Sequence, residues 1–338
     1  MPNFKTIRTL ALMLILGLIL AGCGAAAPTA TPVPAIAIKF QMSWVHEYSA
    51  AGYYASEKNG HFAKQNLDVD LLVGGFFDGR YIEAQDEVFA GKAEFGLSNA
   101  TAILQAREKG QPLVAIATIL QRNPLTVISL KSSNIQQPQD LVGKTVAVSE
   151  GGATQLVKVL LTSQGIDLAS VNIVPRTDFG VGTLLDGSVD ALVGWIINEG
   201  VAVKEAGAEP SFMLLNDYGI PDYATLIFTS EDMIKNKPEL VEGFLRGAIA
   251  GWEDVVKDPE AAIVRVLEYD NTLNRDEQLN RLQAALPLLQ PARAKIGLMD
   301  KTTWDNIYNV LIDAGVLTSD VDVASAFNTS FLDKIYGQ

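Results

Sequence analysis

Aromatic and polar side chains that could bind a ligand follow a short apolar run near residue 40. The segment FQMSWVHEYSAAGYYASEKNGHF, residues 40–62, places Trp44, His46 and Tyr48 within five positions of one another. Their rings offer flat apolar faces, and the imidazole and the phenol offer hydrogen bonds at the ring edge. This mixture is typical of a pocket for a flat ligand, although a packed core would use some of the same rings.

Further candidate binding residues follow other predicted strands. Phe77 comes after the glycine turn that closes DVDLLVGG, and Asn99 ends the apolar run AEFGLSN. In the second half of the chain, the turn SEGGAT holds Gly151, Gly152 and Thr154. Glycines let a ligand approach the backbone, and the helix expected after them presents free N–H groups to an acceptor. A plain strand-to-helix turn also favours glycine.

The run SVDALVGWIINEG supplies a second group of ring and polar side chains. Trp195, Asn198 and Glu199 stand at or just after the end of its predicted strand, and Tyr223 adds a ring further along the chain. Ligands of open α/β sheets bind beyond the carboxyl ends of the strands. We therefore expect these residues to share one site with those of the first half.

Catalytic and metal-binding motifs are missing from the sequence. It has two histidines, His46 and His61, and neither stands in a carboxylate or cysteine cluster with metal-ligand spacing. GxSxG, GxxxxGK[ST] and HExxH are also absent. We expect a protein without catalytic residues, metal or cofactor. The alternative is a secreted enzyme acting on a heterocycle, with His46 and Asp78 or Glu150 as its acid–base groups.

The charge balance narrows the class of partner. The 338 residues carry a formal net charge of -13, with 48% hydrophobic and 19% charged residues, as in a globular protein. An acidic chain is a poor ligand for nucleic acid, because phosphate binding needs a basic surface. The balance also disfavours anionic lipid head groups. A neutral, zwitterionic or small ligand is favoured.

The first residues predict export and a lipid anchor. Lys5 and Arg8 precede an apolar stretch, residues 10–20, that is too short to span a bilayer comfortably. The stretch ends in Leu-Ala-Gly-Cys and resembles a bacterial lipobox, which implies cleavage before Cys23 and attachment of a fatty acyl chain such as palmitate to its thiol. An ordinary secretory signal is the alternative. We expect a signal peptide at 1–22 and a lipid-anchored linker at 23–36, on the extracytoplasmic side of the cell membrane.

From residue 35 onward, the pattern alternates between strands and helices. Strand-like runs stand near residues 35–44, 68–75, 93–99 and 112–120, with helical spacing between them. RYIEAQDEVFAGK is among the predicted helices. The pattern repeats after residue 124 and gives way to amphipathic helices from residue 231, which we expect to pack on the first part of the chain. Such alternation predicts βαβ units on mostly parallel sheets.

Two similar units in tandem indicate two doubly wound α/β lobes with a hinge and a cleft between them. We expect the chain to cross between lobes near residues 121–126 and 216–224. The predicted first lobe comprises 37–123 plus 221–338, with extra C-terminal helices, and the predicted second lobe comprises 124–220.

With these features, the chain resembles the solute-binding proteins of ABC importers. The resemblance is carried by MSWVHEYSAAGYYASEKNGHFAKQNLDVDLL, GKAEFGLSNATAILQAREKGQPLVAIATI, DLVGKTVAVSEGGATQ and SVDALVGWIINEG. It implies a periplasmic binding protein type 2 fold, a monomer whose lobes close on a small molecule, and a membrane permease and ATPase as partners. It also implies that Trp44 stacks on a heteroaromatic ring, with polar contacts from Asn99, the 151–154 turn and the pair Asn198-Glu199.

The branch that the chain resembles includes binders of riboflavin, thiamine pyrimidine precursors and sulfonates. Arg80, Arg122 and Arg176 do not cluster, whereas an anionic ligand would need a strong cationic site. Rings are plentiful, so riboflavin is favoured over a pyrimidine precursor or a sulfonate. Related pyrimidine synthases rely on a cysteine-rich motif, and this chain has no cysteine after Cys23. A sensory role in place of transport stays open.

Overall fold

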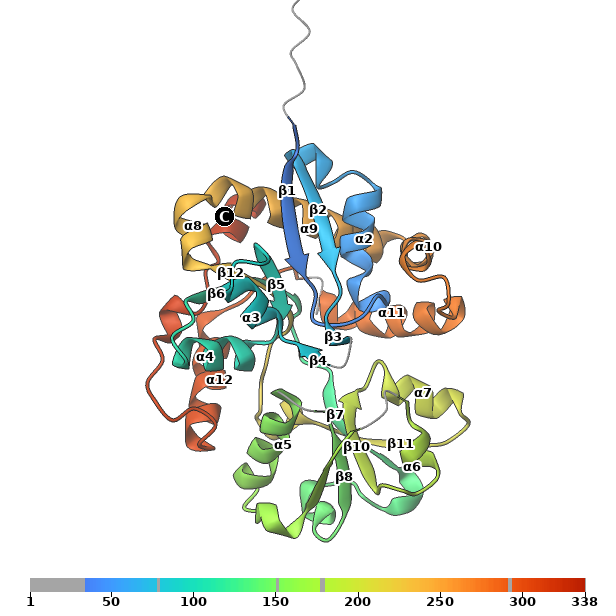
Figure 1. Ribbon diagram of the computed structural model, residues 1–338. Coiled ribbons are helices and arrows are strands. Elements are labelled where there is room, and N and C mark those ends of the chain that lie inside the picture. Colours follow the sequence, from blue (N-terminus) through green and yellow to red (C-terminus); the bar gives the residue numbers. More distant parts are fainter. Residues whose placement is uncertain (1–33, 78–79, 150–151, 177–179, 291–293, 338) are drawn as a thin grey trace, which may run out of the picture. The chain divides into compact units, whose positions relative to one another are not determined.

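The computed structural model describes residues 34–77, 80–149, 152–176, 180–290 and 294–337. The predicted signal peptide, Cys23 and Gly151 lie outside these residues, and so does the side chain of Phe77. The part from Ala35 to Gln338 forms one compact unit with two five-stranded sheets, each flanked by helices (Figure 1).

The first sheet has the strand order β2-β1-β5-β12-β6. Its edge strand β2 alternates buried Leu67, Val69 and Leu71 with exposed Asp68 and Asp70, as expected where one face of a sheet packs on a core. Strand β6 is buried along its whole length because helices cover both of its faces. The bounds are Ile36–Gln41 for β1, Leu67–Leu72 for β2, Phe95–Ser98 for β5, Leu113–Leu120 for β6 and Ala224–Ser230 for β12.

The second sheet has the order β11-β7-β10-β8-β9. We call the part built on the first sheet the first lobe and the part built on the second sheet the second lobe; the second lobe is green to yellow in Figure 1. The bounds are Leu125–Leu130 for β7, Thr145–Val148 for β8, Asn172–Pro175 for β9, Ala191–Trp195 for β10 and Pro210–Leu214 for β11.

The chain passes from the first sheet to the second between Leu120 and Leu125 and returns between Leu214 and Ala224. Each passage delivers one antiparallel strand: β7 opposes β10 and β11, and β12 opposes β5 and β6. The other strands of each sheet run parallel. The two-lobe α/β architecture is thereby confirmed, with mixed sheets, while the exact lobe bounds stay a prediction.

Helices of the first lobe come from both ends of the chain. The segment RYIEAQDEVFAGK is not one helix: Arg80–Ile82 forms strand β4, which pairs with β3 (Gly75–Phe77) in a hairpin, and a helix begins only at Ala84. The helices of this lobe are α2 (Ala51–Lys58), α3 (Ala84–Phe89), α4 (Ala100–Glu108), α8 (Glu231–Asn236), α9 (Pro238–Lys257), α10 (Pro259–Tyr269), α11 (Arg275–Leu289), α12 (Lys301–Asp313) and α13 (Ser330–Tyr336).

The second lobe carries α5 (Gly152–Ser163), α6 (Gly182–Leu185) and α7 (Glu199–Glu205). In the first lobe, the C-terminal helices pack on earlier elements: α9 on α2, α12 on α4, and α11 and α13 on β6. No helix in the described ranges is long and apolar enough to cross a membrane.

Close packing of α2 on α9 fixes the segment that follows β1. A Cβ atom added at Gly251 would lie 2.0 Å from the Ser56 hydroxyl, and one added at Gly52 would lie 2.2 Å from the Trp252 ring. Only glycine allows this approach, which leaves Trp252 2% exposed. The short 3-10 helix η1 (Tyr48–Ala50) leads directly into α2 and is positioned with it.

Candidate functional site

A cavity of about 800 Å³ lies between the lobes and is lined by residues of both. Its walls come from the ends of β1, β5, β8 and β10, from the β3–β4 hairpin and from α11. It has the size and the mixed polar and apolar lining of a small-molecule site. Six of the residues predicted from the sequence line it: Trp44, Asn99, Gly152, Trp195, Asn198 and Glu199.

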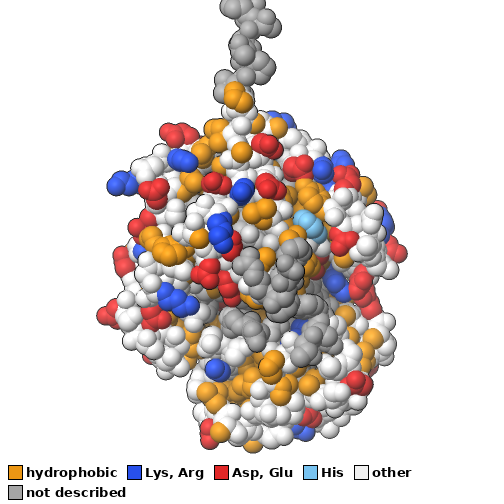
Figure 2. All heavy atoms as spheres, viewed as in Figure 1, with side chains coloured by type: hydrophobic (Ala, Val, Ile, Leu, Met, Phe, Trp, Pro, Cys, Tyr) orange, Lys and Arg blue, Asp and Glu red, His pale blue; other side chains and the backbone are white. Residues whose placement is uncertain are grey.

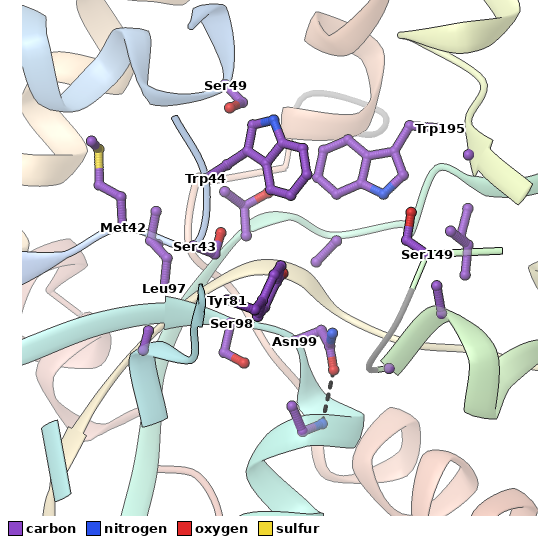
Figure 3. Close-up of a pocket in the computed structure, with 18 of the residues that line it drawn as sticks. Met42, Ser43, Trp44, Ser49, Tyr81, Leu97, Ser98, Asn99, Ser149 and Trp195 are labelled. Carbon is purple, nitrogen blue, oxygen red and sulfur yellow. Dashed lines mark hydrogen bonds between the residues drawn. The ribbon is translucent and has the colours of Figure 1, made fainter. Parts of the chain in front are cut away.

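Trp44 and Trp195 are the two tryptophans among the described residues that line this cavity. Trp44 follows β1 in the first lobe, Trp195 ends β10 in the second lobe, and their indoles point toward one another (Figure 3). Gly75, with a φ of 74°, makes room for Trp44, because a Cβ atom there would lie 2.9 Å from its ring. The two indoles therefore project into the cavity from opposite walls.

Asn99 lies where β5 gives way to α4. Its Oδ1 atom accepts a hydrogen bond of 2.8 Å from the backbone N–H of Ala102 and so caps the helix (Figure 3). A Cβ atom at Gly152 would lie 3.1 Å from Nδ2 of Asn99, so the two lobes come close at this point. The capping bond fixes the orientation of the Asn99 amide within the cavity wall.

A buried ion pair forms the second-lobe wall. Arg176 donates to Oε1 of Glu199 at 2.8 Å, with side chains 4% and 13% exposed, and also to the carbonyl of Gly180. Oε2 of Glu199 accepts from the backbone N–H of Trp195 at 2.7 Å. A Cβ atom at position 194 would lie 2.5 Å from that oxygen, so a glycine is needed there. The pair neutralises the guanidinium and holds the Trp195 backbone.

The first-lobe wall contains a row of charged groups that the sequence analysis missed. Glu47 lines the cavity while 8% exposed, and Ser49 Oγ donates to its Oε1 at 2.8 Å. Burial raises the pKa of Glu47 to about 7, with opposing effects of Ser49 and Arg281 and a further rise from Glu199. On α11, Arg281 donates to Glu277.

Tyr48 lies behind the cavity wall and links the lobes. Its side chain is 1% exposed, and its backbone N–H donates to Oε1 of the buried Gln278 at 2.8 Å. Its hydroxyl donates to Oδ1 of Asn198, the residue before α7. Burial raises the pKa of Tyr48 well above its usual value. The phenol therefore acts on the site through Asn198.

Three other predicted residues do not line the cavity. His46 Nδ1 is hydrogen-bonded to the hydroxyl of Tyr54 at 2.8 Å, and burial lowers the pKa of His46. Thr154 Oγ1 donates to the carbonyl of Ser149 at 2.8 Å. Tyr223 donates to Asp300 Oδ2 at 3.1 Å, and burial raises the pKa of Tyr223 to about 12. Each of these three side chains therefore has a hydrogen-bond partner within the protein.

The passages between the lobes meet at a buried carboxyl group. Asp222, 3% exposed, accepts from the backbone N–H groups of Ala100 and Thr101 at 3.1 and 3.2 Å. Asn123 of the other passage donates to it at 3.3 Å. Burial raises the pKa of Asp222 to about 7, and these hydrogen bonds limit the rise. Asp222 thus ties both passages to the start of α4.

Among the described residues, no three His, Cys, Asp or Glu side chains are placed to hold a metal ion. Tyr81 of the hairpin is a further lining residue, and it was not predicted because RYIEAQDEVFAGK reads as a helix. The members of α11 were missed because nothing local in the sequence shows where the C-terminal helices dock.

The chain is similar to one known protein family and to individual proteins described as binding proteins. The NMT1/THI5 like model matches residues 47–262. The chain is 26% identical to the riboflavin-binding protein RibY of Chloroflexus aurantiacus, covering 96% of the chain and 98% of that protein. It is also 26% identical to the formylaminopyrimidine-binding protein of Halalkalibacterium halodurans, covering 97% and 99%.

Among solved structures, the fold is similar to the periplasmic aliphatic sulphonate binding protein SsuA of Escherichia coli. The TM-score is 0.65 at 12% identity, covering 86% of this chain and 91% of that one. The two-lobe architecture and the family match agree, and the family model covers well over half of the sequence. The chain belongs to the NMT1/THI5-like family.

Proposed function

We propose that this protein is the solute-binding receptor of an ABC importer and that its cargo is riboflavin. The observation that carries the proposal is the pair of indoles, Trp44 and Trp195, which point toward one another across a cavity of about 800 Å³. A flat tricyclic ring placed between them would gain about 0.5–1.5 kcal/mol from each stacked pair beyond its area burial.

Two relatives support a heteroaromatic cargo. One is named for riboflavin and the other for a formylaminopyrimidine, at the same identity and over nearly the full length of both chains. We therefore keep a thiamine pyrimidine precursor as the second candidate. Riboflavin comes first because its larger ring system can contact both indoles at once.

The proposed mechanism is capture without covalent chemistry. A ligand that touches Trp44 in one lobe and Trp195 in the other is bound better by the closed arrangement than by an open one. Ligand therefore shifts the population toward closure, and the closed receptor delivers its cargo to a membrane permease with its ATPase. In the enzyme alternative, His46 and either Asp78 or Glu150 would be the acid–base groups. His46 is hydrogen-bonded to Tyr54, and Asp78 and Glu150 lie outside the described residues. Recovery of unchanged ligand after long incubation is expected.

The proposed location is the outer face of the cell membrane, with a monomeric receptor tethered through acylated Cys23. Intact mass measured on the membrane-extracted protein tests this step. A mass corresponding to residues 23–338 plus acyl groups supports the anchor. A mass without acyl groups argues for an ordinary secretory signal.

Titration of the purified folded part with riboflavin tests the cargo. Flavin fluorescence should be quenched with a dissociation constant in the micromolar range or below, because indoles quench a stacked flavin. A parallel calorimetric titration with the formylaminopyrimidine tests the second candidate. If micromolar riboflavin neither loses fluorescence nor releases heat when it is mixed with the protein, riboflavin is removed from consideration.

A further inference from the structure

Glu47 stands out among the charged groups of the cavity. It lines the cavity, is 8% exposed, and within the described part of the chain its carboxyl group has Ser49 Oγ as its one hydrogen-bond partner and no ion-pair partner. A buried carboxyl group in this situation leaves one oxygen atom for another partner. Among the described residues, Ser49 is the one group for which a hydrogen bond to this carboxyl group is found, and the charge of Arg281 also acts on it.

Two of the three cations among the described lining residues are paired with carboxylates. Arg176 is paired with Glu199, and Arg281 with Glu277. Burial raises the pKa of Glu83, and the charge of Lys109 opposes this rise. Acidic groups outnumber basic groups among the described lining residues: Glu47, Glu83, Asp86, Glu199 and Glu277 against Lys109, Arg176 and Arg281. The wall therefore favours an uncharged or cationic guest over an anionic one.

The chemistry of a carboxyl group defines the guest more closely. In its protonated form it presents an O–H donor beside a carbonyl acceptor. That pair is complementary to a ring edge with an N–H donor next to an acceptor, such as the imide of riboflavin or the amino group and ring nitrogen of an aminopyrimidine. Burial raises the pKa of Glu47 to about 7, which makes the protonated form available near neutral pH.

We propose that Glu47 is the specificity-determining residue of this cavity and pairs through its carboxyl group with an N–H and acceptor edge of a planar heterocycle. The inference deepens the proposed function and rests on it. Its consequence is discrimination against sulfonates and phosphorylated rings. A guest that lacks this edge would leave the buried carboxyl group without a partner, which costs affinity.

Two substitutions separate the pairing from charge and volume. Glu47→Gln keeps an acceptor and a donor in the same places, whereas Glu47→Leu removes both. Glu242→Gln is the matched control, because it removes one acidic group of the first lobe, on α9 and outside the lining residues. The ligands are riboflavin, riboflavin methylated at its imide nitrogen, the formylaminopyrimidine and butanesulfonate. Thermal unfolding verifies that each variant is folded.

We expect Glu47→Leu to weaken riboflavin binding about tenfold or more and Glu47→Gln to stay within about threefold of the unaltered protein. Methylation of the imide should cost about tenfold in the unaltered protein and nothing further in Glu47→Leu. Equal riboflavin affinity in Glu47→Leu would overturn the proposal. Additive effects of methylation and Glu47→Leu would also overturn it, because independent effects mean no direct pairing.

The pH profile supplies a second readout. Affinity of the unaltered protein should fall about tenfold from about pH 6.5 to about pH 8.5, as Glu47 loses its O–H donor. Glu47→Gln should show a flat profile. The groups that interact with Glu47 are Tyr48 and Ser49 of its own segment, Tyr54 of α2, Arg281 of α11 and Glu199 of the second lobe; Arg281 and Glu199 are paired with Glu277 and Arg176. Burial lowers the pKa of His46, which moves its titration away from this range.

The ligand series distinguishes failure of this inference from failure of the proposed cargo. If riboflavin does not bind but the formylaminopyrimidine binds and shows the same Leu and Gln effects, the cargo assignment fails and the role of Glu47 is supported. If riboflavin binds equally to all variants, the cargo stands and the role of Glu47 is refuted. Binding of butanesulfonate in preference to both rings, or binding of no ring that carries this edge, refutes it as well.

Discussion

The hydroxyl of Tyr48 in the first lobe donates a hydrogen bond to Oδ1 of Asn198 in the second lobe. Tyr48 is buried, and its backbone is held by Gln278 of α11. Asn198 precedes α7. Asn280 of α11 donates a hydrogen bond of 3.0 Å to Glu205 of α7. A set of polar contacts thus joins α11 and η1 to α7 beside the cavity.

Removal of the Tyr48 hydroxyl should loosen closure. One interlobe hydrogen bond contributes about 1 kcal/mol, so Tyr48→Phe should lower ligand affinity about fivefold and increase the radius of gyration of the ligand-free protein. Calorimetry and small-angle X-ray scattering measure these effects. Tyr54→Phe is the matched control, because its hydroxyl bonds to His46 within the first lobe. An equal loss of affinity in both variants would contradict a link between the lobes.

Loss of a stacking surface should reduce affinity more strongly. Trp44→Ala is expected to weaken riboflavin binding more than tenfold, and Trp44→Phe less, because a smaller ring still stacks. Isothermal titration calorimetry measures binding without depending on the removed indole. Trp304→Phe serves as the control, since Trp304 is fully buried and does not line the cavity. Unchanged binding by Trp44→Ala would place the flavin elsewhere.

The pKa of Asp222 predicts how stability depends on pH. Burial raises this pKa from 3.8 to about 7, so between about pH 4 and pH 7 the folded protein holds a proton that the unfolded chain has released. Stability should therefore fall as the pH rises through this window, by up to about 4 kcal/mol. Asp222→Asn should remove this part of the slope, measured as urea midpoints between pH 4.5 and 7.5. An unchanged slope would show that Asp222 is ionised throughout this window. The variant Glu47→Gln separates the contribution of Glu47, whose pKa is also raised.

The buried pair Arg176–Glu199 should behave as a unit. Either Arg176→Met or Glu199→Gln alone leaves one buried group without its partner and should cost about 3 kcal/mol of unfolding free energy. The double variant should cost less than the two single variants together. The partly exposed pair Arg246–Glu242 is the matched control, and Arg246→Met should cost less than 1 kcal/mol. Urea unfolding gives all of these values, and additivity at Arg176–Glu199 would argue against the coupling.

Much of the cavity could be predicted from the ends of strands. Trp44, Asn99 and Trp195 were expected there because apolar runs stop at them, and local sequence determines where a strand stops. The same argument placed His46 and Tyr223 in the site, although hydrogen bonds to Tyr54 and Asp300 hold these side chains elsewhere. The orientation of a side chain depends on such partners, and Asp300 lies 77 residues from Tyr223 in the sequence.

The missed part depends on long-range contacts. Glu277 and Arg281 lie about 230 residues after Glu47 and reach it through the docking of α11 on β6 and η1. Strands β11 and β12 were not predicted either, because the apolar runs that form them are short and stand directly before the helical pattern that begins at residue 231. Figure 2 shows Asp and Glu side chains interspersed with Lys and Arg over the visible surface, and the chain carries a net charge of -13.

Ile197 of the second lobe is 3% exposed and belongs to the hydrophobic core of the first, where it meets Leu282 and Leu289 of α11. Drawing it out into water would cost about 1.5–3 kcal/mol. If the lobes separate for ligand entry, as proposed, each opening of the ligand-free protein carries this free-energy cost. The rate of opening should then limit ligand binding, and the association rate constant should lie below the diffusion limit.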